Sequence, residues 1–272
     1  MRRVIFLTDF SETARNALLY GIKMFREKKT EFFLLNAYDM EFSGSPYVMQ
    51  VKDELADESL KGLKNELSML HKLYPNVSIQ LMSRYGSLIE VLRNEISNEE
   101  TKPDFLVLGC RGETILENFF LGSNAFDVIK HIDLPMIVVP RDAQYKKPTK
   151  IAFATDLKTI DENIATPLYE LAKYFDAELM FVNILEDGYI DRLEAEEIIA
   201  NYFPGVKISF NFIDDPDIYK GICTFSADND ADMVAMVRYN YSFFERFFKP
   251  SITKKMVMQP QCPMVILHGS PK

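Results

Sequence analysis

Three glycines at unequal intervals, with a serine directly after the last, are the residues of this sequence best suited to hold an anion. Gly109, Gly112, Gly122 and Ser123 lie in GCRGETILENFFLGSNA, residues 109–125. A glycine has no Cβ, so its backbone can approach a ligand closely or adopt a positive φ. Ser123 stands where a helix is expected to begin, and the amides of a helix N-terminus bind anions. The segment is therefore either a phosphate-binding loop or only a strand-to-helix connection.

No arrangement of side chains in the sequence indicates a committed enzyme. We find no nucleophile paired with a base, no histidine placed by a carboxylate and no G-x-x-x-x-G-K-[ST] loop. The cysteines Cys110, Cys223 and Cys262 are widely spaced, and the three histidines are far apart. A zinc site or disulfide framework is not expected, and a reducing compartment is favoured. We expect Cys110 to be a small apolar loop residue, not a reactive thiol.

Composition and charge narrow the class of protein further. The chain has 272 residues, of which 47% are hydrophobic and 26% charged, and this length favours two domains. Its net charge of -9 argues against broad binding to nucleic acid, which requires lysines and arginines at the phosphates. The apolar run in MRRVIFLTDF is too short for a signal peptide, and no run approaches the roughly 18 residues of a membrane span. We expect a cytoplasmic protein that does not bind membranes.

The sequence contains an internal repeat. RVIFLTDFSETARNALLYGIKMFREKKTEFFLLNAY resembles KIAFATDLKTIDENIATPLYELAKYFDAELMFVNIL, and PDFLVLGCRGETILENFF resembles ADMVAMVRYNYSFFERFF. Thr8-Asp9 aligns with Thr155-Asp156, and Asn36 with Asn183. The second copy is shorter in its middle. We place the domains at residues 1–143 and 144–272, with the linker in RDAQYKKPT, residues 141–149.

Each copy alternates strand and helix patterns. In the first copy the expected strands are VIFLT, EFFLLNAY, VSIQLMS, FLVLG and PMIVVP. Helices are expected after the first strand, over residues 52–73, over SLIEVLRNEIS and over residues 123–131. The predicted apolar positions are Ala14, Leu18, Ile22 and Phe25 in the first helix, and Leu60, Leu63, Leu67 and Leu70 in the second. This alternation predicts two tandem, doubly wound α/β domains, each with a five-stranded parallel sheet.

The glycine spacing G-x2-G-x9-G-S, together with TDFSETARNAL and PMIVVP in the same copy, resembles the universal stress protein family. The resemblance covers essentially the whole chain, in the tandem two-domain form. It implies the adenine nucleotide α-hydrolase-like fold with strand order 3-2-1-4-5. Many members of the family bind ATP, and others do not.

The resemblance also implies which residues would hold the phosphates. Gly109, Gly112, Gly122 and Ser123 would surround the phosphates and ribose, because these positions match the family's motif. Arg111, between the first two glycines, either approaches a phosphate or faces solvent. Taken singly, each glycine could equally be a turn residue.

Two further positions would lie at the base and ribose. Asp9 would lie beside the adenine and ribose, and Ala37 would line the adenine pocket through its backbone. Asp9 could also cap the first helix together with Ser11, and it is the nearest carboxylate candidate for a Mg²⁺ ion bound with ATP. The sequence departs from the family at Leu7, where ATP-binding members often have proline, which puts the shape of the pocket in doubt.

The second copy lacks the glycines. Val237, Asn240 and Pro250 align with Gly109, Gly112 and Gly122, so we do not expect this copy to bind ATP in the family manner. The aromatic segment RYNYSFFERFF instead carries six aromatic residues between 239 and 248. Four of them align with apolar residues of the first copy, which favours packing over a partner surface.

Three functional hypotheses follow. The first is an ATP-binding regulatory stress-response protein with one nucleotide site in the N-terminal domain and at most slow ATP hydrolysis. The second is an interaction module that binds no nucleotide and recognises an unknown protein partner through the aromatic segment. The third is an enzyme using ATP for ligation or sulfur transfer, although no lysine- and serine-rich pyrophosphate loop lies near Asp9. The apolar strands PMIVVP and PMVILH are expected sheet edges whose pairing would give an intrachain pseudo-dimer, and a homodimer is left open.

Overall fold

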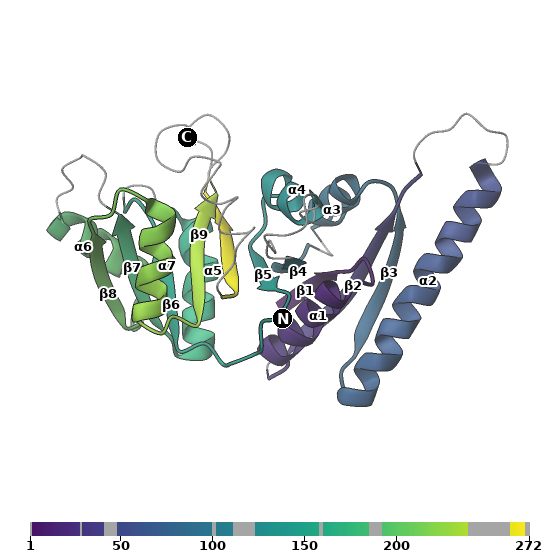
Figure 1. The fold of residues 1–272 in the computed structure, drawn as a ribbon, viewed down its shortest axis with the longest axis horizontal. Coiled ribbons are helices and arrows are strands. Elements are labelled where there is room, and N and C mark those ends of the chain that lie inside the picture. Colours follow the sequence, from purple (N-terminus) through teal and green to yellow (C-terminus); the bar gives the residue numbers. More distant parts are fainter. Residues whose placement is uncertain are drawn as a thin grey trace. The chain divides into compact units, whose positions relative to one another are not determined.

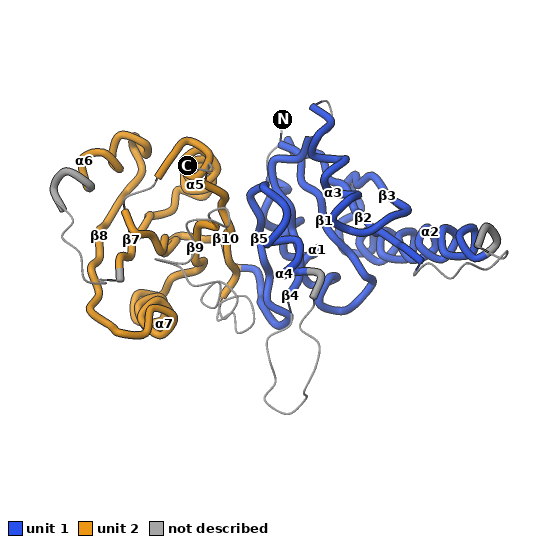
Figure 2. The backbone as a smooth tube through the Cα atoms, turned by 90° about the horizontal axis from the view of Figure 1, so that it is seen from above, with its two compact units in different colours: residues 1–145 blue, residues 146–272 orange. Residues whose placement is uncertain are grey.

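The computed structural model describes residues 2–27, 29–40, 48–99, 102–110, 123–157, 160–184, 192–238 and 262–269. The chain divides into two compact units, Met1–Tyr145 and Lys146–Lys272 (Figure 2). This division falls two residues after the boundary that we placed at residue 143. No described helix is both long and apolar enough to cross a membrane.

The first unit is a parallel sheet with helices between its strands (Figure 1). Its strands are β1 (Arg2–Leu7), β2 (Thr30–Tyr38), β3 (Ile79–Tyr85), β4 (Phe105–Cys110) and β5 (Met136–Pro140). Its helices are α1 (Glu12–Phe25), α2 (Val48–Leu73), α3 (Leu88–Ser97) and α4 (Ser123–His131). The pairings β3-β2-β1-β4-β5 are all parallel, so the predicted order 3-2-1-4-5 is confirmed.

The second unit repeats this plan. Its strands are β6 (Lys150–Ala154), β7 (Glu178–Ile184), β8 (Ile208–Ile213), β9 (Met233–Arg238) and β10 (Met264–His268). Its helices are α5 (Glu162–Phe175), α6 (Arg192–Tyr202) and α7 (Ile218–Asp228). The parallel pairings run β8-β7-β6-β9-β10, which is the same order by copy. The predicted doubly wound α/β fold is therefore confirmed.

Helix α1 forms as its sequence predicts. Ser11 is the N-cap and accepts a hydrogen bond from the backbone N–H of Ala14. The four predicted apolar positions of α1 are all buried. This helix packs against β1, β4 and β5. Because it follows β1 after a short turn, its N-terminus lies at the carboxyl end of the sheet, where ligands bind in this class of fold.

The prediction for α2 was wrong in part. Leu63 and Leu70 are buried, but Leu60 is 38% exposed, and the remaining buried positions of this face are Ser59 and Glu66. Hydrophobic periodicity could not identify these two, because each is polar and is buried through a specific partner. Ser59 shares a 2.8 Å hydrogen bond with Ser83 of β3, and Glu66 forms an ion pair with α1.

Asp232 joins the start of β9 to the start of β6. Its Oδ2 accepts hydrogen bonds from the N–H and Oγ1 of Thr149, at 2.7 and 2.8 Å, and from the N–H of Lys150 at 3.1 Å. Lys146 Nζ lies 2.7 Å from its Oδ1. Burial opposes ionisation of this carboxyl, but the hydrogen bonds outweigh burial, so the pKa of Asp232 is lowered. The first unit has a related link, in which the N–H of Arg3 donates to Asp104 at 2.6 Å.

We predict that Asp232→Asn lowers the free energy of unfolding of the second unit by about 2 kcal/mol at pH 7, because charge-assisted hydrogen bonds are lost. A lowered folded-state pKa contributes stability above the unfolded pKa of about 4, and this stability is lost as the pH falls below it. The variant should therefore approach the wild type in stability on acidification. Urea titrations at pH 7 and pH 3 measure this convergence. The exposed Asp214 of the same unit provides the control variant Asp214→Asn, and equal stability losses at both pH values would contradict the prediction.

Candidate functional site

Three of the predicted site residues lie at the carboxyl edge of one sheet, on adjacent strands. Asp9 follows β1, Ala37 lies near the end of β2, and Gly109 near the end of β4. Strand β1 pairs with β2 on one side and with β4 on the other. The chain winds from β1 to β3 in one direction and over β4 and β5 in the other, so the order reverses between β1 and β4. This switch point is where doubly wound folds bind ligands, and Asp9 and Gly109 flank it.

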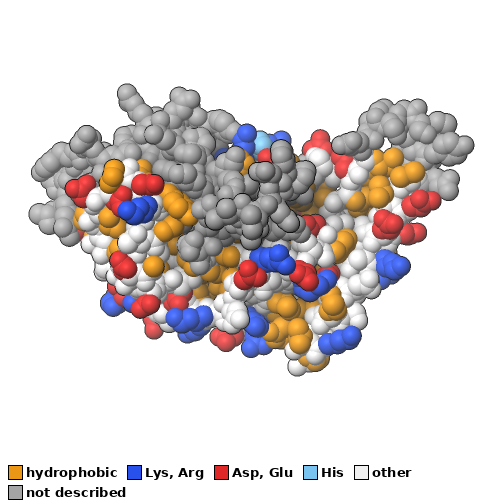
Figure 3. Space-filling view, in the orientation of Figure 1, with side chains coloured by type: hydrophobic (Ala, Val, Ile, Leu, Met, Phe, Trp, Pro, Cys, Tyr) orange, Lys and Arg blue, Asp and Glu red, His pale blue; other side chains and the backbone are white. Residues whose placement is uncertain are grey.

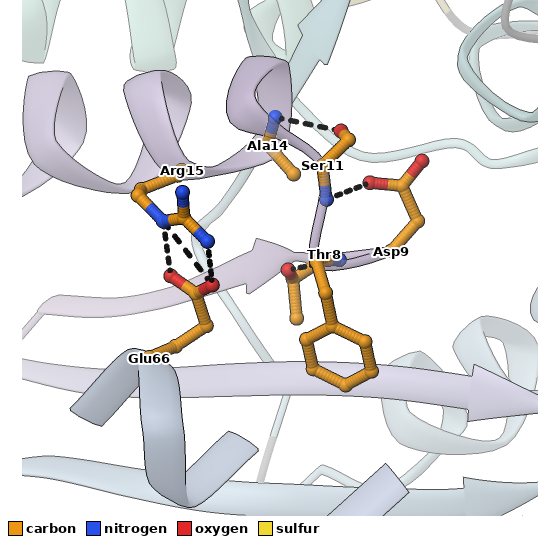
Figure 4. A network of polar contacts seen from close by, with 7 residues as sticks. Thr8, Asp9, Ser11, Ala14, Arg15 and Glu66 are labelled. Carbon is orange, nitrogen blue, oxygen red and sulfur yellow. Dashed lines mark hydrogen bonds and ion pairs between the residues drawn. The ribbon is translucent and has the colours of Figure 1, made fainter. Parts of the chain in front are cut away.

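The turn from β1 into α1 is fixed by its own side chains (Figure 4). Thr8 Oγ1 accepts from the N–H of Phe10 at 3.0 Å, and Asp9 Oδ1 accepts from the N–H of Ser11 at 3.0 Å. Phe10 adopts a left-handed backbone conformation with φ 65°. Asn36 Nδ2, on β2, donates to the Thr8 carbonyl at 2.8 Å. Asp9 therefore shapes the turn that leads into the Ser11 cap, while its side chain remains exposed.

The second unit builds the same turn. Leu157, which aligns with Phe10, has φ 62°, and its N–H donates to Thr155 Oγ1 at 3.1 Å. Asn183 Nδ2 donates to the Thr155 carbonyl at 3.0 Å, as Asn36 does to Thr8. Thr155 and Asn183 thus hold the backbone of this turn as Thr8 and Asn36 hold it in the first unit. They do not by themselves distinguish a unit that binds nucleotide from one that does not.

Helix α2 supports the turn from the side. The Phe10 ring lies against Gly62, where a Cβ would come within 2.5 Å of Phe10 Cζ. Arg15 of α1 and Glu66 of α2 form a forked ion pair, in which Arg15 Nη2 lies 2.7 Å from Glu66 Oε1 and Nε lies 3.1 Å from Oε2 (Figure 4). The hydrogen bond to Glu66 raises the pKa of the Arg15 guanidinium. The turn is therefore held by a ring contact and an ion pair to α2.

Gly109 has a packing role that the sequence did not reveal. A Cβ on this residue would lie 2.7 Å from the carbonyl oxygen of Thr13 and 2.8 Å from its Cγ2, in the first turn of α1. No real Cβ tolerates such distances, so the glycine is required for α1 to approach β4. The prediction that Gly109 serves close approach to a ligand is untested, but this helix contact alone accounts for the glycine.

The other predicted site residues are only partly described. Arg111, Gly112 and Gly122 lie outside the described residues, as does the aromatic segment 239–248. Ser123 is the first residue of α4, where a helix was expected to begin. Its role as an N-cap, and the anion-binding role of the glycines, remain predictions.

The part of this edge that the structure describes has neither a reactive thiol nor a cluster of metal ligands. Burial raises the pKa of the Cys110 thiol to about 12, so it remains a neutral, inert thiol at neutral pH. Within the described ranges, no group of three or more histidine, cysteine, aspartate or glutamate side chains could hold a metal ion.

Sequence reasoning missed the residues that fix the turn from neighbouring elements. Phe10, Gly62 and Glu66 gave no signal, because their partners are distant in sequence. Asn36 did give one, since it aligns with Asn183 in the repeat, and a polar residue kept inside an apolar strand indicates a specific hydrogen bond.

Comparison with known proteins agrees with this architecture. The model of the universal stress protein family matches residues 1–140. Two universal stress proteins of Methanocaldococcus jannaschii are 28% and 27% identical to the chain over 155 and 157 residues. These matches cover 55% and 52% of the chain, and 84% and 95% of the relatives.

A solved universal stress protein from Archaeoglobus fulgidus has a similar fold across both units. It superposes with a TM-score of 0.73 over 97% of each chain, at 16% identity. This likeness concerns the fold alone, whereas the family model matches more than half of the sequence. The chain therefore belongs to the universal stress protein family.

Proposed function

We propose that the first unit binds one ATP at the carboxyl edge of its sheet and acts as a regulatory stress-response protein. The observation that carries the proposal is that Asp9 and Gly109 flank the β1/β4 switch point, with Ala37 at the end of the adjoining strand β2. The glycine spacing of the following segment matches the ATP-binding members that the sequence resembles. The base and ribose would lie by Asp9 and Ala37, and the phosphates by residues 109–123.

The turn supports this assignment physically. Its backbone is held by Thr8, Asn36 and the Ser11 cap, so the turn itself needs little ordering when the ligand binds. Asp9 keeps an exposed carboxylate beside the proposed ribose, which suits an acceptor for ribose hydroxyls. A Mg²⁺ ion would be held mainly by the phosphates, with Asp9 as the candidate protein carboxylate, as Mg²⁺ often is in nucleotide sites.

The second unit is proposed not to bind ATP. It keeps the Thr155 turn, but Val237 occupies the place of Gly109 and is buried within β9. Pro250 replaces the last glycine and lacks an amide hydrogen. No nucleophile and base are paired in the sequence, so turnover of bound ATP would be slow at most.

Calorimetric titration of ATP into the full chain tests the proposal. The wild type should bind one ATP per chain, and Gly122→Pro should bind at least about tenfold more weakly because it removes an amide and the freedom of the backbone. Pro250→Gly, at the aligned position of the second copy, is the matched control and should create no second site. Absence of binding to the wild type, or two equivalent sites, would overturn the proposal. Thermal unfolding of each variant checks that the fold is intact.

A further inference from the structure

Two tyrosines lie in contact where β2 and β3 end, and a lysine of α2 lies over one of their rings. The rings of Tyr38 and Tyr85 meet edge to face, with centroids 5.8 Å apart. Lys52 Nζ of α2 lies 4.2 Å from the centroid of the Tyr85 ring. Tyr85 is 44% exposed, so part of its ring is open to a ligand. We call Tyr38 and Tyr85 the tyrosine wall.

The tyrosine wall adjoins the place proposed for the base. Tyr38 follows Ala37 directly, and Tyr38 is paired in register with Tyr85 on the next strand. Neighbouring strands lie about 4.8 Å apart, so a base held at Ala37 has the Tyr85 ring within reach. Figure 3 shows hydrophobic side chains gathered at the end of the first unit where β2 and β3 terminate.

The backbone beneath the wall is fixed before any ligand binds. The N–H of Gly86 donates to the Tyr38 carbonyl at 2.9 Å, which ties the ends of the two strands together. Ser83 bonds to Ser59 of α2, and side chains alternate along a strand, so Tyr85 projects from the same face of the sheet toward α2. The rings are thus positioned by two strands and a helix.

We propose that the tyrosine wall stacks on the nucleobase and gives the site a preference for purine nucleotides; this inference rests on the proposed ATP site. A base offers a large, flat π face, and stacking on tyrosine is stronger than the contact of an exposed ammonium with a ring. The base therefore displaces Lys52 from the Tyr85 ring. A purine has more stacking area than a pyrimidine. A purine nucleotide therefore loses more binding free energy than a pyrimidine nucleotide when the tyrosine ring is removed.

The test compares ligands that contain the base with one that lacks it. Tyr85→Leu should weaken ATP binding about tenfold and CTP binding less, because stacking on one ring is lost. Its affinity for inorganic tripolyphosphate, which reaches only the phosphate loop, should not change. Tyr38→Leu should act in the same direction, whereas Lys52→Met should bind ATP at least as tightly as the wild type.

Tyr74→Leu is the matched control. Tyr74 also lies under a cation, with Arg26 Cζ 5.3 Å from the ring centroid, but it follows α2 and precedes β3 at the opposite edge of the sheet. It should leave the affinity for all three ligands unchanged. If Tyr85→Leu binds ATP as tightly as the wild type, or weakens ATP and tripolyphosphate equally, the inference is wrong while the ATP site stands. If the wild type binds no ATP, the proposed function itself has failed.

Discussion

Gly109→Val should destabilise the first unit by about 3 kcal/mol, because the new side chain would overlap the first turn of α1. The nearest atom, the Thr13 carbonyl oxygen, would lie 2.7 Å from the Cβ, and it belongs to the backbone of a helix that packs against three strands. Relief requires α1 to move away from β4. Hydrogen exchange of the β4 and α1 amides in the full chain measures the loss, with peptides of the second unit as an internal reference.

Two further variants test whether the overlap with the α1 backbone causes this loss of stability. Thr13→Ser removes the methyl group that would lie 2.8 Å away, but it leaves the carbonyl oxygen, so it should restore little stability to Gly109→Val. Gly109→Ala should cost less than Gly109→Val but should still lower the protection of β4 and α1, because its Cβ meets the same carbonyl oxygen. Unchanged protection of β4 in Gly109→Val, with ATP binding lost, would show that the glycine serves the ligand and not the helix.

Arg15→Leu should cost the first unit about 3 kcal/mol, since Glu66 would keep a buried carboxylate without its guanidinium. The Glu66 side chain is only 4% exposed, whereas that of Arg15 is 36% exposed. Replacing both residues with leucine should recover most of the loss, because no charge then remains buried. The same hydrogen-exchange measurement, read on α1 and α2, gives the coupling between the two residues.

Arg141→Leu is the control for this ion pair. Arg141, which follows β5, forms an ion pair at 3.2 Å with Glu12 of α1, the helix that also carries Arg15. Both side chains are largely exposed, so the variant should change stability little. If Arg15→Leu is as mild as Arg141→Leu, then Glu66 reaches solvent or another donor and the buried pair is not what holds α2 to α1.

Much of the fold could be predicted because it follows from local pattern. Strands β4 and β5 are continuous apolar runs, as strands covered on both faces require, and the apolar face of α1 matched its periodicity at every predicted position. The repeat then supported the prediction, since the first two and the last two strands of the sheet each had a matching segment in the second copy. Helix α2 broke the pattern because its buried face includes Ser59 and Glu66, whose burial depends on partners in β3 and α1.

The sequence by itself determined the two-copy α/β architecture, the family and the candidate glycine segment, because periodicity, turn residues and motif spacing are properties of neighbouring positions. Only the tertiary structure showed that Gly109 accommodates Thr13, that Phe10 rests on Gly62, and that Tyr38 meets Tyr85. Each of these contacts joins residues from different elements. Their distances depend on how helices and strands pack, and no local pattern in the chain encodes that packing.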